Sequence, residues 1–89
     1  MLSRKIERAL EDRGIEYDVF GCCGDFNFAI VVENIEINIY FEEEEAEEYS
    51  LTVYRKDTED ENAEHEEVFD KRYKSIRGLK VIDKYMKRS

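Results

Sequence analysis

The chain is poor in the residues on which catalytic and metal sites usually depend. Its 89 residues include no proline, one histidine, two cysteines and four scattered glycines. A phosphate-binding loop needs its glycines close together, and a structural zinc site needs four ligands, usually Cys or His. The single histidine, His65, lies among glutamates with no nucleophile motif, so we interpret it as an exposed loop residue rather than a general base. We therefore expect no enzymatic activity, no cofactor and no metal site.

Long apolar segments are also missing. No apolar run approaches the roughly 18 residues that a membrane-spanning helix requires. The first residues include Arg4 and Glu7, which are charges where a secretory signal peptide needs an apolar stretch. Cys22 and Cys23 are adjacent, which is a poor arrangement for a disulfide and fits a reducing compartment. With no repeats and no proline-containing linker, residues 1–89 are expected to form a single cytoplasmic domain.

Acidic charge, by contrast, is abundant and unevenly distributed. The net charge is −9, and 42% of the residues are charged, against roughly 25% in an average globular protein. Residues 33–70 carry sixteen acidic side chains against two basic ones, whereas residues 71–89 carry eight basic side chains and one acidic one. An acidic middle is thus followed by a basic end, a pattern that favours a binding role over catalysis.

Apolar side chains at helical spacing predict a helix at each end of the chain. The first is expected over about 4–13, with Ser3 as its N-cap and Gly14 as the left-handed residue that follows its end. The second is expected over about 76–87, with Ser75 as its N-cap. Both helices carry an apolar stripe on one side, so both are expected to pack on a common core.

Between the helices, apolar and polar side chains alternate at strand spacing. This alternation predicts strands over about 15–19, 26–32, 35–41 and 49–54, and a short fifth edge strand over 68–73. The dipeptide Glu33-Asn34 suits a tight hairpin because Asn tolerates a positive φ. Short connections favour pairing of consecutive strands. We therefore predict an α+β fold: a four- to five-stranded antiparallel meander with the N-terminal and C-terminal helices packed on one face.

The two faces of this sheet are expected to differ in polarity, as is common for antiparallel sheets. The face under the helices would be built from Phe26, Phe28, Ile30, Ile35, Ile37, Ile39, Leu51 and Val53. The opposite face would show Asn27, Glu36, Asn38, Tyr40, Ser50, Thr52 and Tyr54.

Acidic connections follow the third and fourth predicted strands, and they are the candidate binding surface. Carboxylates on alternate strand positions lie about 6.6 Å apart, a spacing that suits basic pockets made for successive phosphates. The plain alternative is a pair of solvated, self-repelling loops that keep the protein soluble. The candidate partner-binding residues are Glu42, Glu43, Glu44, Glu45, Glu47 and Glu48, then Asp57, Glu59, Asp60 and Glu61, with Tyr40 and Tyr54 adding desolvated contacts.

The second acidic connection does not fit a calcium-binding loop. An EF-hand counted from Asp57 needs Gly at its sixth position and Glu at its twelfth. Those positions hold Asn62 and Val68. A dedicated calcium site is therefore not expected.

The basic end of the chain allows two interpretations. Its side chains either bind phosphate or neutralise the acidic connections of the same domain. A nucleic-acid-binding protein is usually basic overall, and the sequence pI is about 4.6, so direct binding of nucleic acid is not expected. The residues in question are Lys71, Arg72, Lys74, Arg77, Lys80, Lys84 and Lys87.

With acidic runs at Glu42–Glu48 and Asp57–Glu67, the chain resembles the small acidic inhibitors that phages make against host nucleases, of the anti-CRISPR and anti-restriction type. The resemblance lies in size, charge and α+β layout. It implies a non-catalytic inhibitor that occupies a basic nucleic-acid-binding groove of a nuclease effector in the host cytoplasm. The lysine-rich end departs from a purely acidic DNA mimic. Two alternative functions stay open: a small protein–protein interaction module or homodimer, and a weak nucleic-acid binder that uses the basic C-terminal helix. The expected partner is a basic protein or, for a homodimer, a second copy of the chain.

Overall fold

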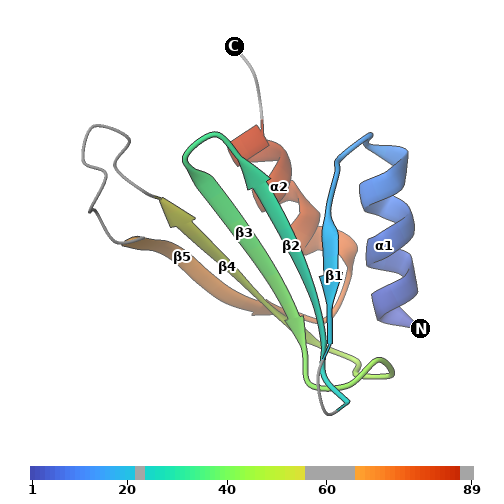
Figure 1. The fold of residues 1–89 in the computed structure, drawn as a ribbon. Coiled ribbons are helices and arrows are strands. Elements are labelled where there is room, and N and C mark those ends of the chain that lie inside the picture. Colours follow the sequence, from blue (N-terminus) through green and yellow to red (C-terminus); the bar gives the residue numbers. More distant parts are fainter. Residues whose placement is uncertain (22–23, 56–65, 87–89) are drawn as a thin grey trace.

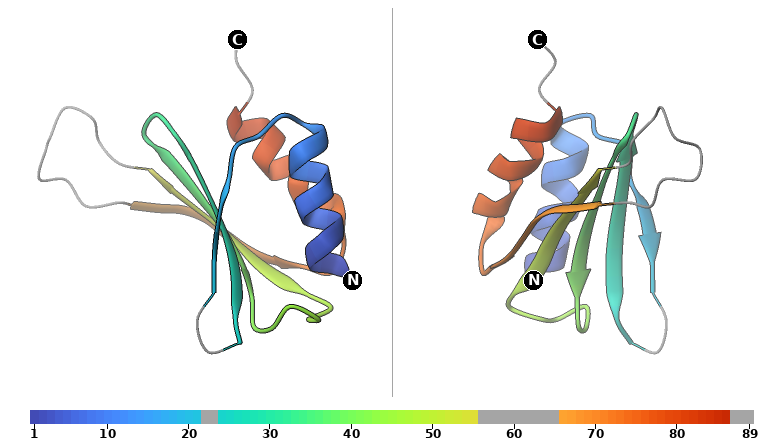
Figure 2. Two further views of the ribbon diagram at one scale, coloured as in Figure 1. Left: turned by 45° about the vertical axis from the view of Figure 1, so that its right-hand side comes forward. Right: turned by 90° about the vertical axis from the view of Figure 1, so that its left-hand side faces the viewer.

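The computed structural model describes residues 1–21, 24–55 and 66–86 as one antiparallel sheet with two helices (Figure 1). The elements are α1 (Leu2–Asp12), β1 (Asp18–Phe20), β2 (Phe26–Val32), β3 (Ile35–Phe41), β4 (Tyr49–Arg55), β5 (Glu66–Tyr73), the 3₁₀ turn η1 (Ile76–Gly78) and α2 (Leu79–Met86). The strands lie in the order β1-β2-β3-β4-β5, and every neighbouring pair is antiparallel. Figure 2 shows both helices on the same side of the sheet. The predicted α+β meander is therefore confirmed, with five strands.

The core lies between the helices and the inner face of the sheet, which is the face turned toward α1 and α2. The strand alternation places apolar side chains of β2, β3 and β4 on this face, as predicted, and the register aligns them across the strands. Ile6 and Leu10 of α1 and Leu79 and Ile82 of α2 complete the core. The fully buried strand residues are Phe28, Ile30, Ile37, Ile39, Phe41, Tyr49, Leu51 and Val53.

Helix α1 ends as the sequence predicts, but it begins earlier. Gly14 has a φ of 68°, its N–H donates to the Glu11 carbonyl, and the Ile15 N–H donates to the Leu10 carbonyl, which is a Schellman end. Ser3 is not the N-cap: the helix starts at Leu2, and the Ser3 side chain is fully buried. The prediction was wrong because the Ser3 hydroxyl donates to the carbonyl of Glu44, far away in the sequence, at 2.7 Å. A long-range contact has replaced the local cap.

The hairpin between β2 and β3 turns at Glu33-Asn34, as expected, with Val32 paired to Ile35. The residue with positive φ, however, is Glu33 at 55°. The left-handed conformation costs roughly 1–2 kcal/mol for a residue with a Cβ atom. The hairpin therefore holds Glu33 in a strained conformation that glycine would adopt freely.

Strand β5 is longer than the predicted 68–73 and contains an irregularity. The register shifts between Val53 and Tyr54, so that Val53 pairs with Phe69 and Tyr54 pairs with Glu67. Val68 is the extra residue, and both Val68 and Phe69 pack against the core. The bulge explains how two consecutive residues of an edge strand contribute to one side of the sheet.

The C-terminal helix is joined to the sheet through Tyr49. Ser75 accepts a hydrogen bond from the Arg77 N–H at 3.3 Å, as its predicted capping role requires, but the first turn is the 3₁₀ turn η1 rather than α-helix. The buried Tyr49 hydroxyl donates to the Ser75 carbonyl at 2.7 Å, and burial raises the pKa of Tyr49 to about 12. Gly78 lies directly over this contact, because a Cβ atom there would clash with the Tyr49 hydroxyl and approach Cδ2 of Tyr73 within 2.9 Å.

Gly78→Ala should therefore destabilise the protein, although the same change stabilises an ordinary exposed helix by about 1 kcal/mol. We expect a loss of about 1–3 kcal/mol, because the added methyl group has no space between Tyr49 and Tyr73. Urea denaturation measures the effect. Lys80→Ala, at an exposed position of α2, is the control and should change stability by less than about 0.5 kcal/mol. A stabilised Gly78→Ala variant would contradict the close packing.

Glu33→Gly should stabilise the protein by about 0.5–1 kcal/mol, because relief of the left-handed conformation outweighs the extra chain entropy of glycine. Glu33→Ala removes the same carboxylate but keeps a Cβ atom, so it should give no comparable gain. Thermal unfolding of the two variants separates the backbone effect from the charge effect. Equal melting temperatures would show that the strain is not the cause.

Candidate functional site

The first acidic connection, residues 42–48, which we call the acidic loop, is attached to the rest of the fold on two sides. On one side, the Glu44 carbonyl accepts from buried Ser3, and the Glu44 carboxylate pairs with Arg4 at 2.9 Å. On the other side, Arg72 of β5 lies 3.5 Å from Glu42 and 3.6 Å from Glu48. These contacts hold the loop between α1 and the edge of the sheet.

Within the acidic loop, the backbone brings the carboxylates around a shallow hollow. The Ala46 N–H donates to the Glu43 carbonyl at 3.1 Å, and Ala46 packs against the core. The hollow has a volume of about 660 Å³, and its other lining residues are Glu42, Glu43, Glu45, Glu47 and Glu48. In the described part of the chain, no group of three or more His, Cys, Asp or Glu side chains is arranged to hold a metal ion.

The six glutamates of the acidic loop thus fall into two groups. Glu42, Glu44 and Glu48 make the ion pairs that fasten the loop. The alternate positions Glu43, Glu45 and Glu47 are exposed, and none of them has an ion-pair partner among the described residues. Sequence reasoning treated all six alike, because their separation into two groups depends on contacts with Ser3, Arg4 and Arg72.

The second set of candidate acids is not placed beside the first. Asp57, Glu59, Asp60 and Glu61 lie outside the described residues. The strand ends that flank them, Arg55 and Glu66, pair with each other at the opposite end of the sheet from the acidic loop (Figure 1). A seven-residue strand spans roughly 20 Å, and β4 separates the two ends by that length. The strand ends that bound the two acidic connections are therefore well separated.

Tyr40 and Tyr54 both lie on the outer face, meaning the face of the sheet turned away from the helices, as predicted. Tyr40 is 40% exposed and pairs with Asn27 and Ser50, close to the acidic loop. Tyr54 is half-buried and pairs with Glu36 near the other end of the sheet. The structure thus places Tyr40 beside the acidic loop and Tyr54 away from it.

Sequence reasoning missed two exposed apolar residues of the outer face. Phe20 is 55% exposed and Val31 is 63% exposed. Phe20 pairs with Asn27, so it stands on the same face as Tyr40. The signal was available, because the alternation of apolar Tyr17 and Val19 with polar Asp18, continued by one residue, puts Phe20 on the side of Asp18.

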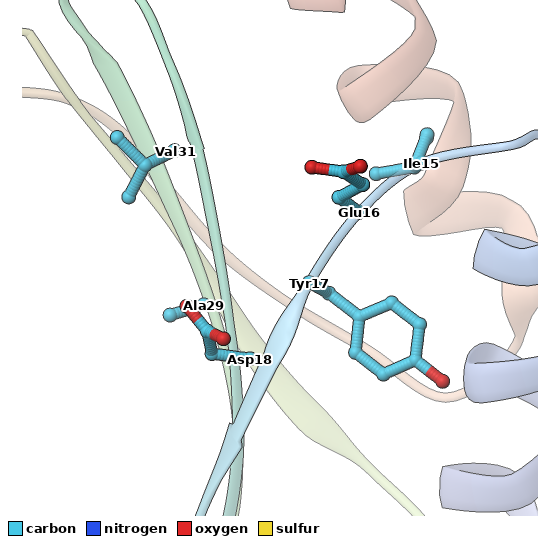
Figure 3. A pocket seen from close by; sticks show the side chains of 6 residues that line it. All are labelled: Ile15, Glu16, Tyr17, Asp18, Ala29 and Val31. Carbon is cyan, nitrogen blue, oxygen red and sulfur yellow. The ribbon is translucent and has the colours of Figure 1, made fainter.

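A second hollow, of about 470 Å³, lies where β1 diverges from β2 (Figure 3). Asp18 lies beside Ala29, while the Tyr17 ring points toward α1, where its hydroxyl donates to the Glu11 carboxylate at 3.0 Å. The pKa of Tyr17 is raised to about 12, chiefly by burial and next by this hydrogen bond to a carboxylate. The remaining lining residues are Ile15, Glu16 and Val31. The hollow supplies negative charge but no histidine, cysteine, serine or lysine.

The basic end of the chain neutralises part of the acidic charge within the domain. Arg72 does so at the acidic loop. The guanidinium of Arg13 pairs with Asp83 at 2.9 Å and joins the end of α1 to α2. The ammonium group of Lys71 lies 5.5 Å from the centre of the Tyr73 ring. The two ion pairs of Arg72 favour the internal-neutralisation interpretation for that residue, whereas the Arg13 and Lys71 contacts do not bear on it.

Comparison with known proteins identifies no relative of this chain. No protein-family model, no curated protein and no solved structure matches the chain. None of the described helices is long and apolar enough to cross a membrane.

Ser3→Ala should loosen the acidic loop. The change removes the donor to the Glu44 carbonyl and should cost about 1 kcal/mol in the free energy of unfolding. The Ala46 amide should then exchange its hydrogen faster, because its acceptor is in the same loop. Ser50→Ala, on the outer face of β4, is the matched control. Unchanged exchange at Ala46 would mean that Ser3 does not hold the loop.

Proposed function

We propose that this protein is a non-catalytic inhibitor that occupies a basic nucleic-acid-binding groove of a nuclease effector, in the manner of anti-CRISPR or anti-restriction proteins. The observation that carries the proposal is the acidic loop, in which Glu43, Glu45 and Glu47 are exposed and have no ion-pair partner among the described residues, while Glu42, Glu44 and Glu48 pair with arginines of the fold. Such a loop offers several negative charges in a set arrangement, as a nucleic-acid backbone does.

The attachment of the loop supports binding for an energetic reason. A loop that must be ordered on binding loses conformational entropy, which weakens the complex. The hydrogen bond from buried Ser3 and the packing of Ala46 against the core order the acidic loop before any partner arrives. The net charge of −9 would also attract a basic surface over a distance and raise the association rate at low salt.

The ion pairs of the acidic loop distinguish the glutamates that can offer their full charge to a partner from those that cannot. Ion pairs to Arg4 and Arg72 already neutralise part of the charge of Glu44, Glu42 and Glu48. A basic partner would have to compete with these arginines. Glu43, Glu45 and Glu47 face no such competition among the described residues, so they should contribute most to binding.

The alternative of a homodimer formed by packing two outer faces is disfavoured by charge. The outer face carries the acidic residues Asp18, Glu36, Glu67 and Asp70. Among the paired strand residues of this face, the one basic residue is Arg72. Two copies packed face to face would bring these carboxylates together, and like charges across an interface oppose association. A basic protein fits this face better.

The proposal is tested by capturing proteins from a bacterial lysate on the immobilised chain and eluting them with a short DNA duplex. A nuclease effector should be captured and displaced by the duplex. The variant with Glu43→Gln, Glu45→Gln and Glu47→Gln should bind the captured effector about tenfold more weakly or worse. The difference should shrink as salt is added, because exposed charges are screened.

The matched control removes three other exposed acids, with Asp12→Asn, Glu16→Gln and Glu33→Gln. This variant has the same net charge as the loop variant, so it should retain most of the affinity if position matters. Equal losses of affinity in the two variants would show that overall charge, and not the position of the glutamates, determines binding. A captured protein that DNA does not displace would argue against occupation of a nucleic-acid groove.

A further inference from the structure

A small hollow on the outer face combines two exposed aromatic rings with an unsatisfied polar atom. The register aligns Phe20, Asn27 and Tyr40 on three neighbouring strands, with Asn27 in the middle. Neighbouring strands lie about 4.8 Å apart, so Phe20 and Tyr40 are roughly 10 Å apart at the backbone. The hollow has a volume of about 320 Å³, and Gly21 and Asp25 complete its lining.

The unsatisfied atom is the side-chain oxygen of Asn27. It is buried and has no hydrogen-bond partner among the described residues. Proteins pair nearly all buried polar atoms, because an acceptor removed from water without a donor lowers stability. Because the oxygen is buried, an incoming N–H group reaches it only when the Asn27 side chain turns toward the hollow, and that group would then supply the donor that the described fold does not.

The surroundings of Asn27 favour a planar cation as the source of that donor. Phe20 and Tyr40 offer ring faces on which a guanidinium group can stack. Asp18, which shares the outer face with Phe20, and Asp25 in the lining add negative charge and disfavour an anionic ligand. A lysine ammonium is charged but not planar, and a neutral amide is planar but not charged.

We propose that this hollow binds an arginine side chain of a basic protein partner, with the guanidinium between Phe20 and Tyr40 and an N–H donated to the Asn27 oxygen. The inference deepens the proposed function and rests on it, since it names one contact of that interface. Tyr40 lies two residues before the acidic loop, so the hollow and the exposed glutamates belong to the same end of the sheet. The charged loop would attract the partner, and the hollow would select arginine over lysine.

The test is an NMR titration of the isolated protein with three short capped peptides that differ at one position: arginine, lysine or citrulline. The arginine peptide should shift the signals of Phe20, Asn27 and Tyr40 in a saturable manner. The lysine and citrulline peptides should bind about fivefold more weakly or worse, because the lysine ammonium is not planar and the citrulline side chain is not charged. Equal binding of the three peptides, or shifts confined to the acidic loop, would overturn the proposal.

Variants then locate the site. Phe20→Ala and Tyr40→Ala should each weaken binding of the arginine peptide, whereas Tyr40→Phe should retain most of it because the ring remains. Val31→Ala removes an exposed apolar side chain of the same face outside the hollow, so it should have no effect. Circular dichroism of each variant shows whether the fold is intact. Unchanged affinity in folded Phe20→Ala would refute the role of the aromatic pair.

The two proposals fail in different ways. If the arginine peptide binds in the hollow but DNA does not displace any captured protein, the arginine site stands and the nuclease function fails. If a captured effector depends on Glu43, Glu45 and Glu47 but is insensitive to Phe20→Ala and Tyr40→Ala, the function stands and the arginine site fails.

Discussion

Burial of a single face of the sheet is the constraint on which the rest of this structure depends. Leu10 of α1 and Ile82 of α2 lie over the apolar residues of β2, β3 and β4, and the ion pair between Arg13 and Asp83 joins the two helices to each other. Since both helices lie on the inner face, neither of them covers the outer face (Figure 2). The face of the sheet that stabilises the fold is thus separate from the face that the helices leave uncovered.

The meander topology distributes the acidic charge. In an antiparallel meander, successive connections lie at alternate ends of the sheet, so the acidic loop is at one end and the pairing of Arg55 with Glu66 is at the other. The acidic loop also lies beside the start of α1, where Ser3 and Arg4 contact Glu44. An acidic segment that would repel itself in isolation is therefore held in place by two elements distant in sequence, and only part of its charge is presented outward.

Local patterns predicted the elements well and their detailed contacts less well. Period-two alternation identified β2, β3 and β4, and Gly14 marked the end of α1. The errors arose where a distant partner or the backbone geometry outweighed the local preference. Ser3 bonds to Glu44 instead of capping its helix, and Glu33 rather than Asn34 has the positive φ. Neither outcome can be derived from neighbours in the sequence alone.

By itself, the sequence determined the alternation of apolar and polar residues, and hence the one-sided sheet, the two amphipathic helices and the acidic character of the strand connections. Only the tertiary structure decided which glutamates of the acidic loop have an ion-pair partner, because the arginines concerned come from α1 and β5. It also brought Phe20, Asn27 and Tyr40 together, since cross-strand register depends on pairing between strands. Composition supplies the charge and the rings, but side chains far apart in the sequence become neighbours only through packing and register.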